Sequence, residues 1–342
     1  CNVPGPNPSF LVGNLGSVIF QKQHIGLLAN KWYKKFRTLP YVGYYKVFKP
    51  AIMVNDTELV KNILINDFGS FYSNDISGSD DPQDIGSGNP FTQQDEQKWK
   101  TGRAAMASLF SASKVASKYS AENVTACLFS VEANCFDDPN SKFRKIGRKV
   151  FQASFWSGIR FTLLFYFPYI VELFAISIVA DEVVDWIEKL VKDITEIRQN
   201  KAVENLDMFQ VLLNSQKKYK LSMKQLTGHT LGSFVDGYET SSTSMSFAMW
   251  HLARNPDIQE RLYEDISEVL QKHGNEFSYE AINEMEYLNM VMQETMRLNT
   301  IILSMHRKCR KPYTLPQLPG QEKPFVIQPG TPVLIPVYAI HQ

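Results

Sequence analysis

Gly237, Glu239 and Thr240 interrupt the apolar stretch at residues 231–242, LGSFVDGYETSS. Glycine inside a helix costs about 1 kcal/mol relative to alanine, and threonine competes for backbone carbonyls that the helix needs. An acid, a hydroxyl and a glycine at the centre of a helix are typical of a cofactor or ligand site in a bundle. For Thr240 taken alone, the alternative is a hydroxyl that bonds back to its own helix.

The element that must position these residues is a helix of about eight turns. Apolar residues at helical spacing flank the stretch on both sides, at Leu226, Leu231, Phe234, Val235, Met245, Phe247 and Trp250. Ser222 and Gln225 form a capping-box pattern at its start, and Asn255-Pro256 ends it. The spacing therefore places Glu239 and Thr240 near the middle of one long helix.

A second candidate pair lies in residues 287–298, YLNMVMQETMRL. Glu294 and Arg297 are three residues apart, so they share one face of a helix and can form an ion pair. The same spacing is common on solvated helices, and it carries little weight alone.

Taken together and in this order, the two segments resemble the cytochrome P450 family of haem-thiolate monooxygenases. The family's small-Gly-x-acid-Thr-Thr/Ser motif matches residues 236–241, and its Glu-x-x-Arg motif matches residues 294–297. The resemblance runs from about residue 3 to the last residue, and two segments are similar to insect microsomal members. The further similar segments are Val3-Pro4-Gly5-Pro6 with Gly13-Asn14, Asp67–Phe71, Trp99–Arg103, Phe143–Gly147 and Asn255–Glu260.

The resemblance implies roles for the candidate residues around a haem b (iron-protoporphyrin IX). The Thr240 hydroxyl would organise proton delivery to bound dioxygen, Glu239 would pass protons inward, and Gly237 would keep the helix slim where oxygen sits. Three further residues match positions that hold the haem propionates, and arginine suits carboxylates through its paired N–H groups. These cofactor-binding residues are Trp99, Arg103 and Arg307.

Two site features follow from the same resemblance. Glu294 and Arg297 are expected to be buried, charged and paired, tying their helix to the segment beneath the haem. Asp236 stands where the family usually has a small residue, and a poorly solvated carboxylate there could take up a proton or pair with a base.

The family's thiolate loop, Phe-x-x-Gly-x-x-x-Cys, is not found in residues 1–342. None of the four cysteines fits that motif, and a free cysteine is usually a small core residue, so no metal ligand is assigned. The chain also opens on Cys1 without the family's hydrophobic anchor, and a helix expected after residues 99–103 is missing. We therefore expect an incomplete copy that is inactive by itself.

The complete protein is expected to insert one oxygen atom of O2 into a lipophilic small molecule. Its electrons would come from NADPH-cytochrome P450 reductase, docked with help from the basic residues Lys98, Lys100 and Arg103. The expected location is the endoplasmic reticulum membrane, on its cytosolic face. A haemless paralogue acting as a binding or membrane-associated helical protein, and an unstable product of a broken gene, are the alternatives.

Composition agrees with a globular protein of 342 residues, 44% of them hydrophobic and 21% charged. The net charge of +1 argues against nucleic acid as a partner. Residues 161–180, FTLLFYFPYIVELFAISIVA, approach the length of a membrane span, but Pro168 and Glu172 interrupt them. The resemblance to microsomal members implies a helical lid that dips into the membrane surface, and both this lid and a buried core helix are favoured over a span.

The expected fold is mainly α with small β-sheets, an incomplete cytochrome P450 fold in a single domain over residues 1–342. Residues 41–54 predict a strand pair turning near Lys49-Pro50, and Asp56 predicts the cap of a helix through Ile65. Residues 74–90 predict a loop whose side chains, with residues 155–169, Phe234 and 301–305, line a hydrophobic pocket. Short strands and turns are expected over residues 317–336.

Overall fold

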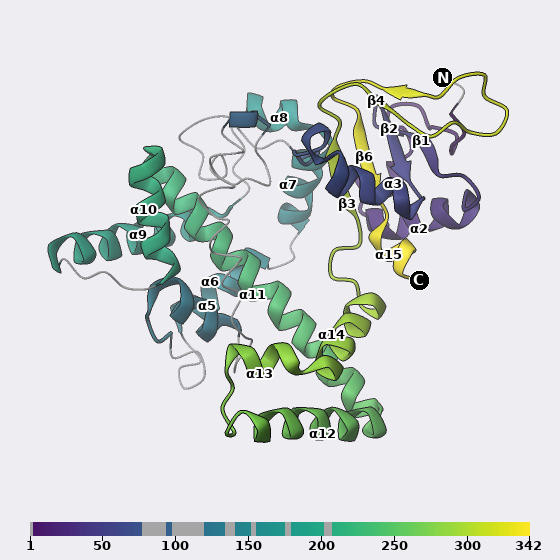
Figure 1. The fold of residues 1–342 in the computed structure, drawn as a ribbon. Helices are drawn as coiled ribbons and strands as arrows, with labels where there is room; N and C mark the ends of the chain where they lie inside the picture. Colours follow the sequence, from purple (N-terminus) through teal and green to yellow (C-terminus); the bar gives the residue numbers. More distant parts are fainter. Residues whose placement is uncertain are drawn as a thin grey trace.

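The computed structural model describes residues 3–76, 94–97, 120–133, 141–151, 155–174, 179–201 and 207–342. A small sheet with its covering helices forms one part, and a larger set of helices forms the other (Figure 1). This mainly helical architecture with small sheets is the fold class that the sequence predicts. The predicted helix at Trp99 and most of the predicted loop at 74–90 lie outside the described residues.

The larger sheet joins strands from both ends of the chain. Its order is β1 (Tyr41–Lys46), β2 (Lys49–Val54), β6 (Pro332–Ile335) and β3 (Met305–Lys308), and β2 pairs in parallel with β6. β1 and β2 turn at residues 47–48, two residues before the predicted turn, because Val47 adopts a positive φ of 58°. A second sheet pairs β4 (Tyr313–Thr314) with β5 (Val326–Ile327).

Alternate residues of the larger sheet enter two separate cores, as the period of two along a strand requires. One face packs on the N-terminal helices α1 (Gly16–Ile19) and α2 (Ile25–Lys35) through Val42, Met53 and Leu334. The other face packs on α3 (Thr57–Lys61) through Ile52, Val54 and Val333.

The helix predicted after Asp56 begins as expected, because the Asp56 side chain accepts from Leu59 N at 2.8 Å. It continues beyond α3 as a π-helical turn, η1 (Asn62–Asn66), followed by the short η2 (Phe68–Ser70). The periodicity of the sequence does not distinguish this wider turn from an α-helix, since both bury the same apolar side chains.

A helical core lies around the first third of α11 (Met223–Arg254), where Leu226, Leu231 and Phe234 are buried. The predicted capping box begins this helix: Ser222 Oγ accepts from Gln225 N, and Gln225 Oε1 accepts from Ser222 N. The helices that precede it are α5 (Ser120–Phe129), α6 (Lys142–Phe151), α7 (Phe155–Tyr166), α8 (Pro168–Leu173), α9 (Asp181–Lys201) and α10 (Met208–Tyr219).

The chain then returns to the sheet through shorter helices (Figure 1). They are α12 (Pro256–Lys272), α13 (Tyr279–Glu284) and α14 (Glu286–Leu298), followed by the strands β3 to β6 and α15 (Val337–His341). α14 packs on both α11 and α12, and α15 packs on α2 and α14. The segment after α11 therefore connects the helical core to the sheet.

A buried ion pair that the sequence analysis did not single out joins three helices. Arg198 of α9 donates two hydrogen bonds to Asp207, at 2.8 and 2.5 Å, and a third to Phe129 O at the end of α5. The side chains of Arg198 and Asp207 are only 6% and 3% exposed. Asp207 also accepts from Gln210 N at the start of α10 and from the Ser130 hydroxyl.

The apolar stretch at residues 161–180 is divided between two short helices. α7 ends at Tyr166 and α8 begins at Pro168, which cannot donate a backbone hydrogen bond. Of the helices described here, none is long and apolar enough to cross a membrane.

Candidate functional site

The exposure of α11 changes at the start of its central motif. Every residue from Leu226 to Phe234 is buried, whereas every residue from Val235 to Phe247 is at least partly exposed. One continuous helix thus runs from the packed core into a stretch that the described residues leave uncovered. The predicted catalytic residues, Glu239 and Thr240, lie in this uncovered stretch.

Thr240 is exposed, and its hydroxyl donates to the backbone carbonyl of Asp236. Ser244 and Ser246 make the same kind of bond one helical turn back, at 2.9 and 2.8 Å. Each of these bonds occupies the carbonyl of the preceding turn. The oxygen of the hydroxyl can still accept a hydrogen bond from another group. Thr240 therefore has the geometry of the back-bonded alternative and still presents an acceptor on the uncovered side.

Gly237 allows α5 to approach α11 closely. A Cβ atom at this position would lie 2.8 Å from Cγ2 of Val124, closer than two carbon atoms can pack. The neighbouring Tyr238 stacks on Phe234, with ring centroids 5.8 Å apart, and lies against Gly147 of α6. The close packing of α5 on α11 is therefore one reason for a glycine at position 237, and the sequence motif did not reveal it. Its role beside a cofactor stays a prediction.

Asp236 lies one turn before Thr240 and is partly buried. Burial raises the pKa of its carboxyl to about 6, because desolvation disfavours the ionised form. A carboxyl with that pKa exchanges a proton readily near neutral pH. The expectation that an acid at this position could take up a proton agrees with this shift.

Glu294 and Arg297 form a bidentate ion pair on α14. Arg297 Nε donates to Glu294 Oε2 at 2.7 Å, and Arg297 Nη2 donates to Glu294 Oε1 at 2.8 Å. The hydrogen bonds from Arg297 lower the pKa of Glu294. The expectation that the pair is buried is wrong, since the side chains of Arg297 and Glu294 are 45% and 55% exposed. Spacing along a helix determines that two residues can pair, but burial depends on which other elements cover them.

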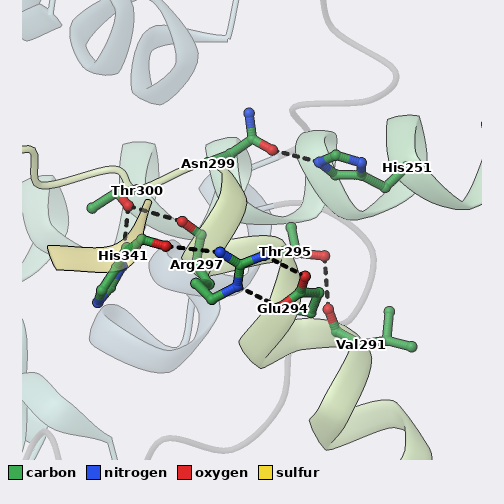
Figure 2. Close-up of polar contacts among 8 residues, drawn as sticks. All are labelled: His251, Val291, Glu294, Thr295, Arg297, Asn299, Thr300 and His341. Atoms are coloured by element: carbon green, nitrogen blue, oxygen red, sulfur yellow. Dashed lines mark hydrogen bonds and ion pairs between the residues drawn. The ribbon is translucent and has the colours of Figure 1, made fainter. Parts of the chain in front are cut away.

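The same end of α14 is tied to two distant segments (Figure 2). Arg297 Nη1 donates to the backbone carbonyl of His341 in α15 at 2.7 Å, and the Thr300 hydroxyl lies 3.2 Å from His341 Nδ1. Asn299 Oδ1 lies 2.5 Å from Nε2 of His251, near the end of α11. Arg297 therefore joins its own helix to the segment that ends the chain. The sequence contained no local signal for this contact.

A cavity of about 350 Å³ lies between α11, α12 and α14. Its lining is largely apolar and includes Leu252, Ile258, Tyr287, Val291 and Leu298, with Glu294 at one side. The central motif of α11 does not contribute to it, because the lining residues of α11 begin at His251, three turns after Thr240. The structure thus separates this cavity from Glu239 and Thr240.

Arg307 lies on β3, away from the long helix. Its Nη1 donates to Asn74 Oδ1 at 2.6 Å and to the carbonyl of His306 at 3.0 Å. The other two predicted propionate ligands, Trp99 and Arg103, lie outside the described residues. The neighbouring His306 is partly buried, and burial together with nearby Lys46 lowers its pKa to about 3, so it is neutral.

The described cysteines do not have the character of an iron ligand. Burial raises the pKa of the Cys309 thiol to about 11, and its Sγ donates to the Lys311 carbonyl at 2.8 Å. A thiolate is the form that binds a metal, so a thiol held protonated as a donor is unsuited to that task. Cys127 is exposed on α5. Within the described ranges, groups of His, Cys, Asp and Glu that could hold a metal ion are absent.

The partly exposed stretch of α11 is the part of the described structure that carries the predicted oxygen-side residues. This stretch offers small and hydroxylated residues with Asp236 and Glu239 beside them. The role of Arg307 toward a haem propionate stays a prediction, because its Nη1 donates to Asn74 and to the carbonyl of His306.

Comparisons with known proteins agree with this arrangement. A sequence profile for cytochrome P450 matches residues 103–342. Cytochrome P450 6j1 of Blattella germanica is 29% identical over 371 residues, covering 98% of this chain and 72% of the relative. Cytochrome P450 6a2 of Drosophila melanogaster is also 29% identical, over 396 residues, covering 99% and 76%. Cytochrome P450 6k1 of Blattella germanica is 25% identical, covering 99% and 74%.

The profile spans most of the chain, and these relatives align with nearly all of it. The long helix with its acid-threonine turn and the Glu-x-x-Arg pair fall inside the matched range. The chain therefore belongs to the cytochrome P450 family of haem-dependent monooxygenases, of the type found in insects.

Proposed function

We propose that this protein forms the side of a monooxygenase site on which dioxygen binds. The site is proposed to act on a lipophilic small molecule. The observation that carries the proposal is the uncovered turn of α11 with Asp236, Glu239 and Thr240. Haem b, when bound, supplies the activation of dioxygen. The chain's own residues then have three tasks: to orient the substrate, to exclude water, and to hold a proton where it is needed.

Thr240 is the residue proposed to hold that proton. Its hydroxyl donates to the Asp236 carbonyl and accepts on the uncovered side, so it can order a water or a bound oxygen species. Glu239 lies next to it on the partly exposed helix face and is proposed to pass protons from solvent. Asp236, with a pKa near 6, is a second reservoir on the same turn.

In the complete enzyme, with the thiolate loop present and haem bound, Thr240→Ala is expected to uncouple oxygen use from product formation and to release peroxide. Product formed per O2 consumed should fall by at least about tenfold, since positioned proton transfer contributes roughly 10²–10⁴-fold to a rate. Oxygen uptake and product measured together check this, while the substrate dissociation constant should stay unchanged. Thr240→Ser should retain coupling.

Ser244→Ala is the matched control, because Ser244 makes the same bond to the preceding turn without belonging to the motif. The proposal would be contradicted if Thr240→Ala formed as much product per O2 as the parent. It would also be contradicted if Ser244→Ala lost as much coupling as Thr240→Ala.

A polypeptide of residues 1–342 expressed by itself is expected to lack the carbon monoxide difference band of a thiolate-ligated ferrous haem. The physical reason is that Cys309 is a buried thiol with a raised pKa, and that its Sγ donates to the Lys311 carbonyl. Difference spectroscopy after haem reconstitution is the measurement. A band that disappears in Cys309→Ser would contradict this assignment and make Cys309 the ligand.

The same experiment discriminates the second candidate function, a haemless helical binding protein. The solvated Glu294–Arg297 pair and the protonated Cys309 favour that candidate, since neither requires a haem. Haem titration that shows no saturable binding, together with a folded chain, would support it.

We further propose that an apolar surface of this protein rests on the cytosolic face of the endoplasmic reticulum membrane. Large apolar side chains are exposed in the N-terminal segment and on α7 and α8. They are Phe10, Phe20, Trp156, Leu173 and Phe174. Gly158 of α7 approaches Gln21 closely, so that Phe20 and α7 lie together. Exposed aromatic residues of this kind suit the boundary between headgroups and acyl chains.

Electrons are proposed to come from an NADPH-dependent reductase. Lys98, Lys100 and Arg103 would help that flavoprotein to dock through complementary charge. The substrate is proposed to be hydrophobic, because residues 155–169, Phe234 and 301–305 of the predicted lining are mostly apolar or aromatic.

A further inference from the structure

The Tyr238 ring lies on the side of α11 opposite to Thr240. The two residues are two positions apart, so their side chains leave the helix axis about 160° apart. Gly237 lies between them in the sequence, and Val124 of α5 packs on its face of the helix. Thr240 itself is exposed. The packed faces of this turn and the Thr240 hydroxyl therefore point in different directions.

Gly147 of α6 lies directly against the Tyr238 ring. A Cβ atom at position 147 would be 2.9 Å from both Cε1 and Cζ of the ring, and 3.2 Å from Cδ1. Glycine in a helix is unfavourable relative to alanine, so a buried glycine inside α6 needs a packing reason. The contact with Tyr238 supplies that reason, because any side chain at position 147 must displace the ring.

Other apolar groups enclose the same ring. Phe234, one turn earlier on α11, stacks on it with the ring planes 9° apart and the centroids 5.8 Å apart. Ala133, which follows α5, packs against both Tyr238 and Phe143 of α6. Phe143 also contacts Phe234, with ring centroids 6.3 Å apart. The surroundings of Tyr238 thus come from α6, α11 and the segment after α5.

Residues 143–147, FRKIG, are one of the segments that resemble insect microsomal members, and the function proposed above gives them no role. Phe143 and Gly147 are four residues apart, so they lie on one face of α6. The structure places both of them on the aromatic pair Phe234 and Tyr238. This face of α6, together with Ala133, forms a slot for the Tyr238 ring.

We infer that Tyr238 is a positioning residue, and that the slot formed by Gly147, Phe143 and Ala133 fixes the rotation of α11 at the acid-threonine turn. The inference rests on the proposed function of Thr240, since a fixed rotation matters to the reaction only if that hydroxyl must point toward dioxygen. Tyr238 acts on the reaction through Thr240.

The contact is tested in the polypeptide of residues 1–342 by hydrogen exchange of the backbone amides of residues 235–241. Gly147→Ala is expected to raise their exchange rates about tenfold, the equivalent of the usual cost of overpacking a core. In a Tyr238→Ala background the same substitution should have no such effect, because the added methyl group then has room. Equal effects in both backgrounds would overturn the inference, since they would show that positions 147 and 238 are not coupled.

A second pair of variants does not depend on Gly147. Tyr238→Ala should raise the exchange of residues 235–237 and 239–241, whereas Tyr238→Phe should leave it as in the parent, because only the ring fills the slot. Exchange at Val333 and Leu334 of β6 reports whether each variant stays folded. Parental exchange in a folded Tyr238→Ala variant would contradict the inference.

Gly158→Ala is the matched control. Gly158 is also a glycine within a helix, and its added Cβ would meet the side-chain end of Gln21 at 2.8 Å. The end of a glutamine side chain can move at little cost, so the exchange of residues 235–241 should stay parental. Faster exchange of these amides in Gly158→Ala would show that the effect does not come from the slot.

In the complete enzyme, with the thiolate loop present and haem bound, Tyr238→Ala is expected to lower product formed per O2 severalfold at an unchanged substrate dissociation constant. Tyr238→Phe should keep the parental coupling. In a Thr240→Ala background, Tyr238→Ala should cause no further loss, because the ring acts through that hydroxyl. A further loss there would show that the two residues act independently, and the positioning role would be wrong.

The inference and the proposed function can fail separately. Parental coupling in Thr240→Ala would contradict the proposed function and with it the positioning role, whereas coupled exchange effects at positions 147 and 238 would still establish the packing. Parental coupling in Tyr238→Ala, beside a loss of coupling in Thr240→Ala, would contradict the positioning role alone.

Discussion

Asp207→Ala is expected to destabilise the protein by about 3–5 kcal/mol, the usual cost of removing one partner of a buried ion pair. The variant leaves the Arg198 guanidinium enclosed, with Phe129 O and Gln210 as its remaining hydrogen-bond partners and the Phe209 ring beside it. It also removes the N-cap of α10, because Asp207 accepts from Gln210 N at 2.9 Å. Urea unfolding followed by circular dichroism is the measurement.

Two variants separate the charge from the cap. Asp207→Asn should keep the cap and lose the ion pair, and therefore recover only part of the stability. Glu196→Ala on α9, the helix of Arg198, removes an exposed pair with Lys192 and should change stability by no more than about 0.5 kcal/mol. An Asp207→Ala variant as stable as Glu196→Ala would show that Arg198 reaches solvent once its partner is gone.

Acidification from pH 7 to pH 4 is expected to cost the protein about 3 kcal/mol of stability through His229 alone. His229 on α11 is 2% exposed, and burial lowers its pKa from 6.5 to about 4. Because the folded pKa is below the unfolded value, the unfolded state binds the proton first as the pH falls. The contribution is complete above pH 6.5 and is lost as the pH falls toward 4.

Other groups titrate in the same range, so the comparison must be with a variant that lacks this imidazole. Asp207 has a lowered pKa and also loses stability on acidification, whereas the raised pKa of Asp236 acts in the opposite direction. His229→Leu should unfold with a flatter pH profile than the parent between pH 4 and 6.5. The variant should fold, since His229 Nδ1 has no partner to lose. Parallel profiles would mean that the imidazole is hydrated in the native state.

Local sequence signals predicted the elements that carry the candidate site. Ser222 with Gln225, and Asn255-Pro256, set both ends of α11, because caps act within one turn of the residues that they satisfy. The periodicity of residues 287–298 and the cap at Asp56 likewise located α14 and α3. The order of two short motifs was enough to indicate the family.

Burial at the site was not predictable in the same way. Glu294 and Arg297 were expected inside the protein, yet both are solvated, since their surroundings depend on elements far away in the sequence. The reverse holds for Arg198 and Asp207, which look like surface charges in the sequence and are enclosed where α5, α9 and α10 meet. A single sequence does not show which helices will cover a charge.

The sequence by itself determined the helices, the hairpin, the position of the acid-threonine turn and the family, because these depend on neighbours within a few residues. Only the tertiary structure decided the parallel pairing of β2 with β6, the approach of α5 to Gly237, and the packing of Gly147 against Tyr238. Those contacts join residues separated by up to about 280 positions. They form because burial of apolar surface and satisfaction of buried polar groups are properties of the whole packed chain.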